Sequence, residues 1–423
     1  MTITINNKNK KPNVPNSTDK GNAIRNLPNL RFPEFREEWE EHELSEYLDF
    51  KNGLNPKPNQ FGKGIKFISV MDILNNAVIT YDCIRASVSV SEEDMSAFSV
   101  QKGDILFQRS SETLEDVGRA NVYVDDIPAV FGGFVIRGKQ KTNYNPLFFK
   151  YLLSSPLARK RIIRMGAGAQ HFNIGQEGLS KVKLPFACID EQNKIAKILY
   201  LLDKRISLQN KIIEDLKKLK SAIIEKVFNG KHSEKLQLND VGSYIRGLTY
   251  SSNDVVEHGG TLVMRSNNIV NGSLLDYNNN VVFVNKQMSA EQQLQNGDIV
   301  ICMANGSSSL VGKSSFYDGN CHSPITIGAF CGIYRSKEPI VKWLFQTNKY
   351  RRYIWNSLQG GNGAIANLNG EDILNMSFSI PNAPIKDTCV KMLTSVDSAL
   401  ENNMSLCALY TLQKQHLLRQ MFI

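Results

Sequence analysis

Long apolar runs are absent from this sequence of 423 residues. A helix that crosses a membrane needs about 18 or more consecutive apolar residues, and no such run occurs. Residues 1–8 also lack the apolar core of a signal peptide. We therefore expect a cytoplasmic protein without a membrane partner.

Paired cysteines are missing as well, since none of the seven cysteines stands in a Cys-x-x-Cys motif. An odd number of scattered thiols does not suit a disulfide framework, and the spacing does not suit a zinc site. The sequence therefore predicts reduced cysteines and no metal centre. The cysteines are Cys83, Cys188, Cys302, Cys321, Cys331, Cys389 and Cys407.

No combination of residues in the sequence is typical of a catalytic site. Residues 306–314 resemble a phosphate-binding P-loop, but one residue too many separates the two glycines. Residues 145–148 resemble part of the tetrapeptide of amino-methyltransferases, yet a proline is missing and no glycine-rich cofactor loop precedes them. The six histidines are isolated from nucleophiles and ligand sets. We therefore predict no catalytic residue, no metal and no bound cofactor, which disfavours a self-contained methyltransferase or nuclease.

One stretch, Ile189–Phe228, has the periodicity of a single long helix. Aliphatic side chains recur every third and fourth residue from Ile195 to Val227, and charged residues fill much of the rest. This pattern is typical of a helix that packs along a partner helix. Asn229-Gly230 then ends the helix. The seam in this stretch includes Leu199, Leu202, Ile206, Gln209, Ile213 and Leu216.

The same seam recurs at the C-terminal end of the sequence, at an offset of 194 residues (403 − 209). Both polar exceptions recur with it, Gln209 as Asn403 and Lys220 as Lys414. We expect the two helices to pack on each other as an antiparallel coiled coil. A polar residue at a core position fixes the register of such a pair, and we predict this role for these four residues. The second seam includes Leu393, Val396, Leu400 and Asn403.

The same offset relates the stretches that precede the two long helices. Between the matching motifs the residues differ freely, so the scaffold is repeated and the loops are not. Two copies that bind different targets are expected to differ in this way, although simple divergence would have the same result. The matching pairs are Gly53-Leu54 with Gly247-Leu248, Gly103-Asp104-Ile105 with Gly297-Asp298-Ile299, and Val117-Gly118-Arg119 with Val311-Gly312-Lys313.

Five segments follow from these patterns. Residues 1–28 are rich in Asn, Lys and Pro, which predicts a disordered tail. Residues 29–185 and 231–380 mix β-like runs with helices, which predicts two α+β domains. Residues 186–230 and 381–423 hold the two long helices. In the first domain we expect strands at 65–70, 104–108, 120–124 and 130–137, and helices at 146–153 and 156–165.

The charge balance and two repeated segments indicate a nucleic-acid partner. The formal net charge is +9 and the pI is near 9.0, which favours a polyanionic partner. The first segment follows each Gly-Asp-Ile strand and mixes Arg or Lys with Asn, Gln and Ser, which can pair with phosphates and base edges. The second is a basic helix that runs into a glycine-rich loop, in residues 159–170 of the first copy and 351–363 of the second, where backbone amides can approach a phosphate closely.

Each segment alone is as compatible with a solvated basic helix and a flexible loop as it is with a contact to DNA. Their recurrence at matching places in both copies favours DNA. The residues that we predict to bind DNA are Arg109, Ser110, Arg119, Arg161, Arg164, Gly168, Gln170, Asn305, Lys313, Arg351, Arg352 and Asn362.

The sequence resembles a known family, the specificity (S) subunits of type I restriction-modification systems. In that family a proline, a Glu-Gln pair and a Leu-Asp-x-x-Ile motif mark the start of the spacer helix, as in residues 185–206 here. The repeated Gly-Asp-Ile and Val-Gly-basic motifs are similar to the strand pattern of the family's target-recognition domains. The resemblance covers roughly residues 30–423. The second copy departs from it at residues 380–387, which lack Glu-Gln, whereas Val396-Asp397 still matches Leu202-Asp203.

The resemblance implies an α+β fold with two tandem-repeated mixed α/β target-recognition domains. Two long helices would join them as an antiparallel coiled coil with pseudo-two-fold symmetry. Each domain would read one half of a bipartite target in double-stranded DNA. The helices would dock two methyltransferase (M) subunits, which motor-nuclease (R) subunits join. The S subunit itself performs no chemistry, so S-adenosylmethionine, ATP and Mg²⁺ are expected on the partner subunits.

The long helix has a length that suits a spacer. About 40 residues span roughly 60 Å at 1.5 Å per residue, and half-sites one DNA turn apart lie about 34 Å from each other. Its exposed basic face, with Lys204, Lys211 and Lys218, is a candidate docking surface. An alternative from another class is a non-enzymatic scaffold whose duplicated domains bind protein or carbohydrate ligands. Salt separates the two, because binding through several phosphates weakens steeply with ionic strength.

Overall fold

A computed structural model describes residues 27–168, 171–230, 234–358 and 366–422 of the chain. The chain divides into two compact units, Met1–Ser207 with Ala408–Ile423, and Leu208–Cys407. Each unit therefore contains one of the predicted recognition domains and part of both long helices. The tail predicted at residues 1–28 lies outside the described residues, apart from residues 27 and 28. The predicted boundaries, which set the long helices apart from the domains, stay a prediction.

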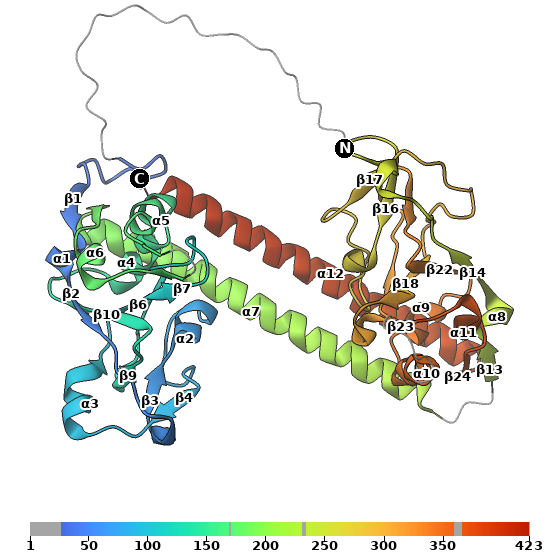
Figure 1. Cartoon of the computed structure of the whole chain (residues 1–423), viewed down its shortest axis with the longest axis horizontal. Helices are drawn as coiled ribbons and strands as arrows, with labels where there is room; N and C mark the ends of the chain where they lie inside the picture. The colour runs from blue at the N-terminus through green and yellow to red at the C-terminus, as the bar shows by residue number, and fades with distance from the viewer. Residues whose placement is uncertain (1–26, 169–170, 231–233, 359–365, 423) are drawn as a thin grey trace, which may run out of the picture. The chain divides into compact units, whose positions relative to one another are not determined.

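The first unit contains two four-stranded sheets (Figure 1). One is antiparallel throughout, in the order β2 (Leu48–Asn52), β10 (Val135–Gln140), β6 (Ile105–Gln108) and β8 (Ala120–Val122). The other has the order β4 (Ala86–Val88), β3 (Phe61–Ile68), β9 (Ala129–Phe131) and β5 (Ser99–Val100), and its β3 and β9 run parallel.

Shorter elements complete the first unit. Two-stranded ladders join β1 (Glu40–Glu43) to β12 (Lys183–Phe186), and β7 (Ser110–Ser111) to β11 (Phe172–Asn173). The helices are α1 (Leu44–Tyr47), α2 (Val70–Asn75), α3 (Glu92–Phe98), α4 (Pro146–Leu153), α5 (Pro156–Ile163) and α6 (Gln176–Ser180), with a 3-10 turn η1 (Pro58–Gln60).

The second unit repeats this plan. Its antiparallel sheet has the order β14 (Gly242–Arg246), β22 (Cys331–Ser336), β18 (Ile299–Cys302) and β20 (Ser314–Phe316). Its second sheet has the order β15 (Val255–Val256), β17 (Val282–Val284), β16 (Thr261–Met264) and β21 (Ile325–Ile327), with β16 and β21 parallel.

Ladders and short helices also recur in the second unit. The ladders join β13 (Glu234–Gln237) to β24 (Ser377–Ile380), and β19 (Ala304–Asn305) to β23 (Ala366–Asn367). The helices are α8 (Leu238–Val241), α9 (Val341–Leu344), α10 (Asn348–Leu358) and α11 (Gly370–Leu374), with 3-10 turns η2 (Ser252–Asp254), η3 (Ser266–Asn268) and η4 (Ser308–Leu310). The prediction of two repeated domains of mixed helix and strand is confirmed.

Local sequence explains where the elements of the first domain begin and end. Helix α4 starts at the predicted proline, and the side chain of Asn145 accepts a hydrogen bond from the backbone of Phe148. The strand predicted at 130–137 was wrong, because it is two strands, β9 and β10. A turn separates them, in which the amide of Val135 donates to the carbonyl of Gly132 at 2.8 Å.

The two long helices are α7 (Ile189–Phe228), with the bounds that its periodicity predicts, and α12 (Ala383–Gln420). In the first unit the start of α7 packs in one core with α4, α5 and α6 and with the last residues of the chain (Figure 1). In the second unit the end of α7 and the start of α12 pack with α9, α10 and α11. Of the predicted seam, Leu199, Leu202, Gln209, Ile213, Leu393 and Leu400 are buried, and Ile206, Leu216, Val396 and Asn403 are half-buried.

An aspartate buried on α7 links three elements of the first unit. The carboxylate of Asp203 accepts from the hydroxyl of Tyr151 at 2.8 Å and pairs with the ammonium groups of Lys150 at 3.3 Å and Lys414 at 2.5 Å. Burial lowers the pKa of Lys150 to about 8, against the opposing pull of Asp203. Burial acts to raise the pKa of Asp203, but the two lysines outweigh it and hold that pKa below its usual value.

The second unit contains the same arrangement. Asp397 on α12 accepts from the indole of Trp343 at 3.1 Å and pairs with Lys342 at 2.8 Å and Lys220 at 2.7 Å. Each aspartate thus binds a lysine from its own domain and a lysine from the other long helix. The seam lysines Lys220 and Lys414 are therefore ion-paired, and within the second unit the side chain of Gln209 donates to that of Asn403.

Both residues of the Glu-Gln pair at the start of α7 form hydrogen bonds within the first unit. Glu191 is completely buried, and it accepts two hydrogen bonds of 2.7 Å from Arg31 and one of 3.0 Å from the indole of Trp39. Gln192 accepts from the backbone of Asn145 at 2.9 Å. The start of α12 has neither residue, and there Lys386 pairs with Glu338 at 3.1 Å. The contacts at the two helix starts therefore differ.

Candidate nucleic-acid interface

Strands β6 and β18 occupy matching places, and each is preceded by a Gly-Asp turn that shapes the backbone. Gly103 and Gly297 have positive φ angles of 95° and 89°, which glycine adopts readily. The carboxylate of Asp104 accepts from the backbone of Gln101 at 3.0 Å, and that of Asp298 accepts from Gln295 at 2.7 Å. Burial raises the pKa of Asp104. The Gly-Asp-Ile motif therefore has a structural role, which is to set the direction of the strand.

The two segments that were predicted separately in each domain lie side by side in the structure. In the first domain β7 pairs with β11, so the residues after β6 meet the residues after the glycine-rich loop. In the second domain β19 pairs with β23 in the same way. The amide of Ile174 donates to the carbonyl of Arg109 at 3.0 Å, and the amide of Leu368 donates to that of Met303 at 2.8 Å. One hydrogen-bonded frame thus occurs twice.

The glycine of each Val-Gly-basic motif lets the basic helix approach. Gly118 and Gly312 have φ angles of 68° and 79°. A Cβ atom would lie 2.5 Å from Ile162 of α5 at Gly118, and 2.7 Å from Ile354 of α10 at Gly312. Both the backbone angle and the contact therefore require glycine. A backbone hydrogen bond holds the next residue beside the end of the strand. The carbonyl of Arg119 accepts from the amide of Gln108 at 2.7 Å, and the carbonyl of Lys313 accepts from the amide of Cys302 at 2.9 Å.

In the first domain the structure brings together part of the predicted set. Arg109 is half-buried and donates to the carbonyl of Gly133 at 3.3 Å, and the hydroxyl of Ser110 donates to the side chain of Asn173. Arg119 is exposed and pairs with Asp116 at 2.7 Å, and Arg164 is exposed at the end of α5.

Two further predicted residues of the first domain, Gly168 and Gln170, belong to the glycine-rich loop. Gly168 is exposed and has a φ angle of 143°, and a Cβ atom there would lie 2.0 Å from the carbonyl oxygen of His171. Gln170 lies outside the described residues. Arg161 is not part of the cluster, because its guanidinium donates to Glu41 and to the carbonyl of Lys183.

In the second domain the described predicted residues are Asn305, Lys313, Arg351 and Arg352, of which Lys313 matches Arg119 of the first domain. The side chain of Asn305 accepts from the backbone of Ser307 at 3.0 Å and donates to Ser266 at 3.4 Å. Lys313 is half-buried, and Arg351 and Arg352 are exposed on α10. Asn362 lies outside the described residues.

A family model described as "Type I restriction modification DNA specificity domain" matches residues 36–218 and, a second time, residues 231–406. The two matches together cover most of the chain. The chain belongs to this family of DNA specificity domains. Residues 36–218 are the first specificity domain and residues 231–406 the second.

Two relatives of the chain are named as specificity subunits. The chain is 28% identical over 208 residues to the putative type I restriction enzyme MjaX specificity subunit of Methanocaldococcus jannaschii, a match that covers 48% of each chain. It is 34% identical over 158 residues to the type I restriction enzyme EcoKI specificity subunit of Escherichia coli K12, which covers 35% of this chain and 31% of that one. These matches therefore span about half of the relatives' length or less.

A solved structure has a similar fold over most of the chain. The crystal structure of a type I restriction-modification S subunit from M. genitalium is similar with a TM-score of 0.62. The two chains are 15% identical, and the similarity covers 94% of this chain and 99% of that one. At this identity the likeness shows the fold alone.

Arg159 is a basic residue of the first specificity domain whose contacts were not predicted from the sequence. Arg159 of α5 donates to the carbonyls of Glu115 at 2.9 Å and Val117 at 2.6 Å, so it holds the Val-Gly-Arg turn. Burial and the neighbouring charge of Arg119 lower the pKa of Arg159 to about 10. Within the described parts of the chain, its Nη1 atom has no hydrogen-bond partner. The matching Arg351 of the second copy was the signal in the sequence for a shared role, but the burial of Arg159 cannot be seen there.

Sites of other kinds are not formed by the described residues. Residues 306–314 contain the turn η4 and lead into strand β20, whereas a P-loop leads into a helix. Among the residues that the structure describes, no three His, Cys, Asp or Glu side chains could hold a metal ion. In the same residues no helix has the length and apolar character needed to cross a membrane.

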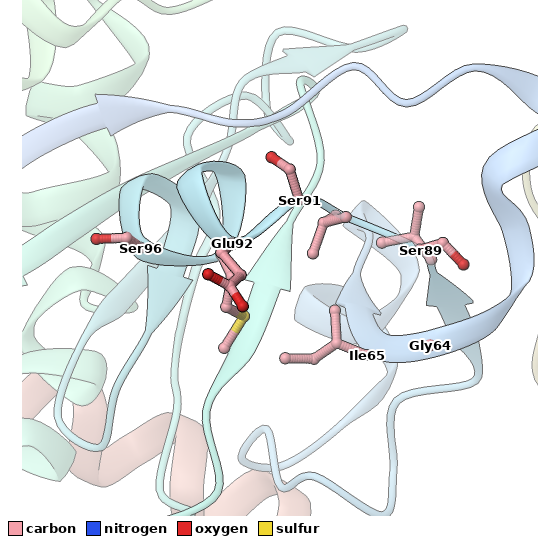
Figure 2. Close-up of a pocket in the computed structure, with 9 residues that line it drawn as sticks. Gly64, Ile65, Ser89, Ser91, Glu92 and Ser96 are labelled. Carbon is pink, nitrogen blue, oxygen red and sulfur yellow. The ribbon is translucent and has the colours of Figure 1, made fainter.

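A hollow of about 560 Å³ in the first specificity domain lies beside α3 and β4 (Figure 2). Ile65 and Met95 contribute apolar surface, and Ser89, Ser91 and Ser96 contribute hydroxyl groups. The hydroxyl of Ser91 already accepts from the backbone of Asp94. Glu92 is the only charged residue in its lining, and a carboxylate repels phosphate. We therefore leave this hollow out of the candidate interface.

Proposed function

We propose that this chain is the DNA-recognition subunit of a type I restriction-modification complex, and that it binds a bipartite duplex with one half-site per specificity domain. The observation that supports this proposal is the repeated frame around strands β6 and β18. Its backbone hydrogen bonds are the same in both domains, whereas its side chains differ, since Arg109 and Ser110 are half-buried and Met303 and Ala304 are buried. Arg109 stands where Met303 stands, and Ser110 where Ala304 stands. A kept frame with changed side chains suits two half-sites of different sequence.

The residues at the frame divide into two chemical kinds. Arg109, Ser110 and Asn305 can donate to and, for Ser and Asn, accept from base edges. Arg119, Arg164, Lys313, Arg351 and Arg352 supply positive charge that suits phosphates, and Gly168 permits a close backbone approach. Gln170 and Asn362 belong to the proposal through their place in the sequence alone. Arg161 is left out, because its hydrogen bonds are made within the protein.

The long helices are proposed to dock two methyltransferase subunits, which motor-nuclease subunits then join. Support comes from an exposed apolar stripe on α7, where Leu208, Ile212 and Leu219 are 60%, 37% and 49% exposed. Their spacing places them on one face of the helix, and the exposed Lys211 and Lys218 lie beside it. Such a stripe suits an amphipathic acidic helix. In this account the chain catalyses nothing, and S-adenosylmethionine, ATP and Mg²⁺ act on the partner subunits.

The proposal can be tested with the chain purified together with its methyltransferase subunits. Affinity is measured for duplexes that carry both half-sites at the native spacing, and for duplexes in which the spacer is lengthened or shortened by single base pairs. Arg109→Ala should weaken discrimination at one half-site by about tenfold, and Lys313→Ala should weaken binding at the other, as expected for single contacts of 1–3 kcal/mol. Lys181→Ala and Lys235→Ala remove exposed charges elsewhere and serve as controls.

Three results would contradict the proposal. The methyltransferase subunits could fail to purify with the chain, which overturns the docking proposal. Binding could be insensitive to spacing or to salt, which favours the scaffold alternative. Each substitution could weaken both half-sites equally, which would show that the residues are wrongly assigned to half-sites.

A further inference from the structure

Two phenylalanines project into solvent from matching turns of the two specificity domains. Phe134 is 69% exposed and Phe330 is 68% exposed, and among the described residues no large apolar side chain is more exposed. Phe134 lies between β9 and β10, and Phe330 between β21 and β22. A single exposed apolar residue is common on protein surfaces and needs no explanation. Two copies at one place in a repeat whose loops otherwise differ do need one.

The backbone of each phenylalanine is joined to the proposed DNA-binding frame. The carbonyl of Phe134 accepts from the amide of Arg109 at 2.9 Å. The carbonyl of Phe330 accepts from the amide of Met303, the residue that matches Arg109, at 2.9 Å, and from that of Ala304 at 3.2 Å. In the first domain the turn that carries the ring is thus bonded to Arg109 of the proposed DNA-binding set, and in the second domain it is bonded to Ala304, which precedes Asn305 of that set.

The turn that carries each ring is closed and braced in the same way in both domains. In the first, Val135 donates to Gly132 at 2.8 Å, and Leu54 donates to Phe131 at 2.9 Å. In the second, the bonds from Cys331 to Gly328 and from Leu248 to Ile327 measure 2.9 Å and 2.7 Å.

The brace also explains the repeated Gly-Leu motif. A Cβ atom at Gly53 would lie 2.1 Å from the carbonyl oxygen of Gly132, and one at Gly247 would lie 2.2 Å from that of Gly328. Only glycine allows this approach. The motif therefore holds the turn in place, and the side chain at its tip is presented from a fixed backbone.

We infer that Phe134 and Phe330 are DNA-contacting residues, each making an apolar contact with the bases of the half-site that its own domain reads. This inference rests on the proposed function. The occupant is DNA and not a partner protein, because each turn is hydrogen-bonded to the segment that contains Arg109 and Ser110, or Asn305, of the proposed DNA-binding set. Phenylalanine contacts bases in two ways, against the methyl group of thymine or against the face of a base step.

The test uses the complex of the full chain with its methyltransferase subunits. The probe is a duplex with the sequence that is found methylated in cells that carry the complex. Phe134→Ala and Phe330→Ala should each lower the affinity by about tenfold or more, as expected for the loss of one aromatic contact with a base. Each should relax the sequence requirement of one half-site only. The slope of log affinity against log salt should not change, because no charge is removed.

Matched variants and a modified probe sharpen the result. Ile127→Ala and Val270→Ala remove apolar side chains that are 52% and 45% exposed, one in each domain, and should have no effect. Phe134→Trp should keep most of the affinity, since it keeps an aromatic surface. Replacing thymine by uracil in a half-site should match the effect of Phe→Ala if the contact is with a methyl group, and should leave affinity unchanged if the contact is with a base step.

Failure of the inference differs from failure of the proposed function. If the wild-type complex binds its spaced duplex and both Phe→Ala variants bind it equally well, the inference is wrong and the proposed function stands. If a Phe→Ala variant loses its methyltransferase subunits, the ring is a protein contact and the inference is wrong. If the wild-type complex does not bind the spaced duplex, the proposed function fails first.

Discussion

Single buried residues decide how the long helices join the domains. Asp203 and Asp397 are 6% and 5% exposed, and each pairs with two lysines. An aspartate that is buried with its partners is costly to remove, because the lysines then lack a counter-charge. The sequence predicted polar register residues on the helices, among them Lys220 and Lys414. It could not predict their partners, since these depend on where the chain folds back.

Asp203→Asn should lower the free energy of unfolding of the first unit by about 3 kcal/mol, because it leaves the buried Lys150 and the half-buried Lys414 without a negative partner. Urea unfolding of the full chain measures the change. Asp215→Asn is the matched control on the same helix, since Asp215 is 61% exposed and its pair with Lys218 is 3.7 Å long. Equal effects of the two substitutions would contradict the role of Asp203.

The effect of Asp203 should also depend on pH in a defined direction. Its pKa in the folded chain lies below the ordinary value of 3.8, so its contribution is present above about pH 4 and is lost as the pH falls further. The difference in stability between the wild type and Asp203→Asn should therefore shrink as the pH falls below about pH 4.

Among the helices and strands, the bounds were predicted best where the periodicity of the sequence was strongest. Helix α7 has the predicted bounds, because its seam is long and uninterrupted and Asn229-Gly230 stops it. Helix α4 begins at its proline for a local reason as well. The run at 130–137 had the composition of one strand, and its division into β9 and β10 depends on the brace from Gly53 and Leu54, which is distant in sequence.

The candidate interface was predictable in part for the same reason. Repetition identified the segments after β6 and β18 and the basic helices, and the structure brings these segments together through the short ladders. It did not identify Arg161 as engaged elsewhere or Arg159 as buried, because partners and burial follow from tertiary packing. Phe134 and Phe330 were missed because apolar residues in β-like runs are expected to be buried.

The pair of Gln209 and Asn403 offers a test of register at the scale of the helices. Replacing both by Leu should raise the thermal unfolding temperature, because two apolar residues replace a polar pair in the seam, and should permit other registers. The measurement is calorimetry together with DNA binding across a series of spacer lengths, in which the variant should lose its sharp preference. Lowered stability with an unchanged spacing preference would contradict the role of this pair.

At the scale of the whole molecule, duplication is the property from which the proposed function follows. The chain contains two specificity domains with one frame and different side chains, and two long helices that each pair a lysine with an aspartate of the other helix. A protein built in this way is suited to two half-sites at a set distance. The helices would fix the distance, and the frames would select the bases.

Recognition of two separate half-sites by the two domains can be tested by a map of methylated adenines in DNA from cells that carry this chain with its partner subunits. We predict one motif made of two short defined sequences separated by a spacer of constant length and variable sequence. A continuous motif without a spacer, or methylation that does not depend on this chain, would contradict the account.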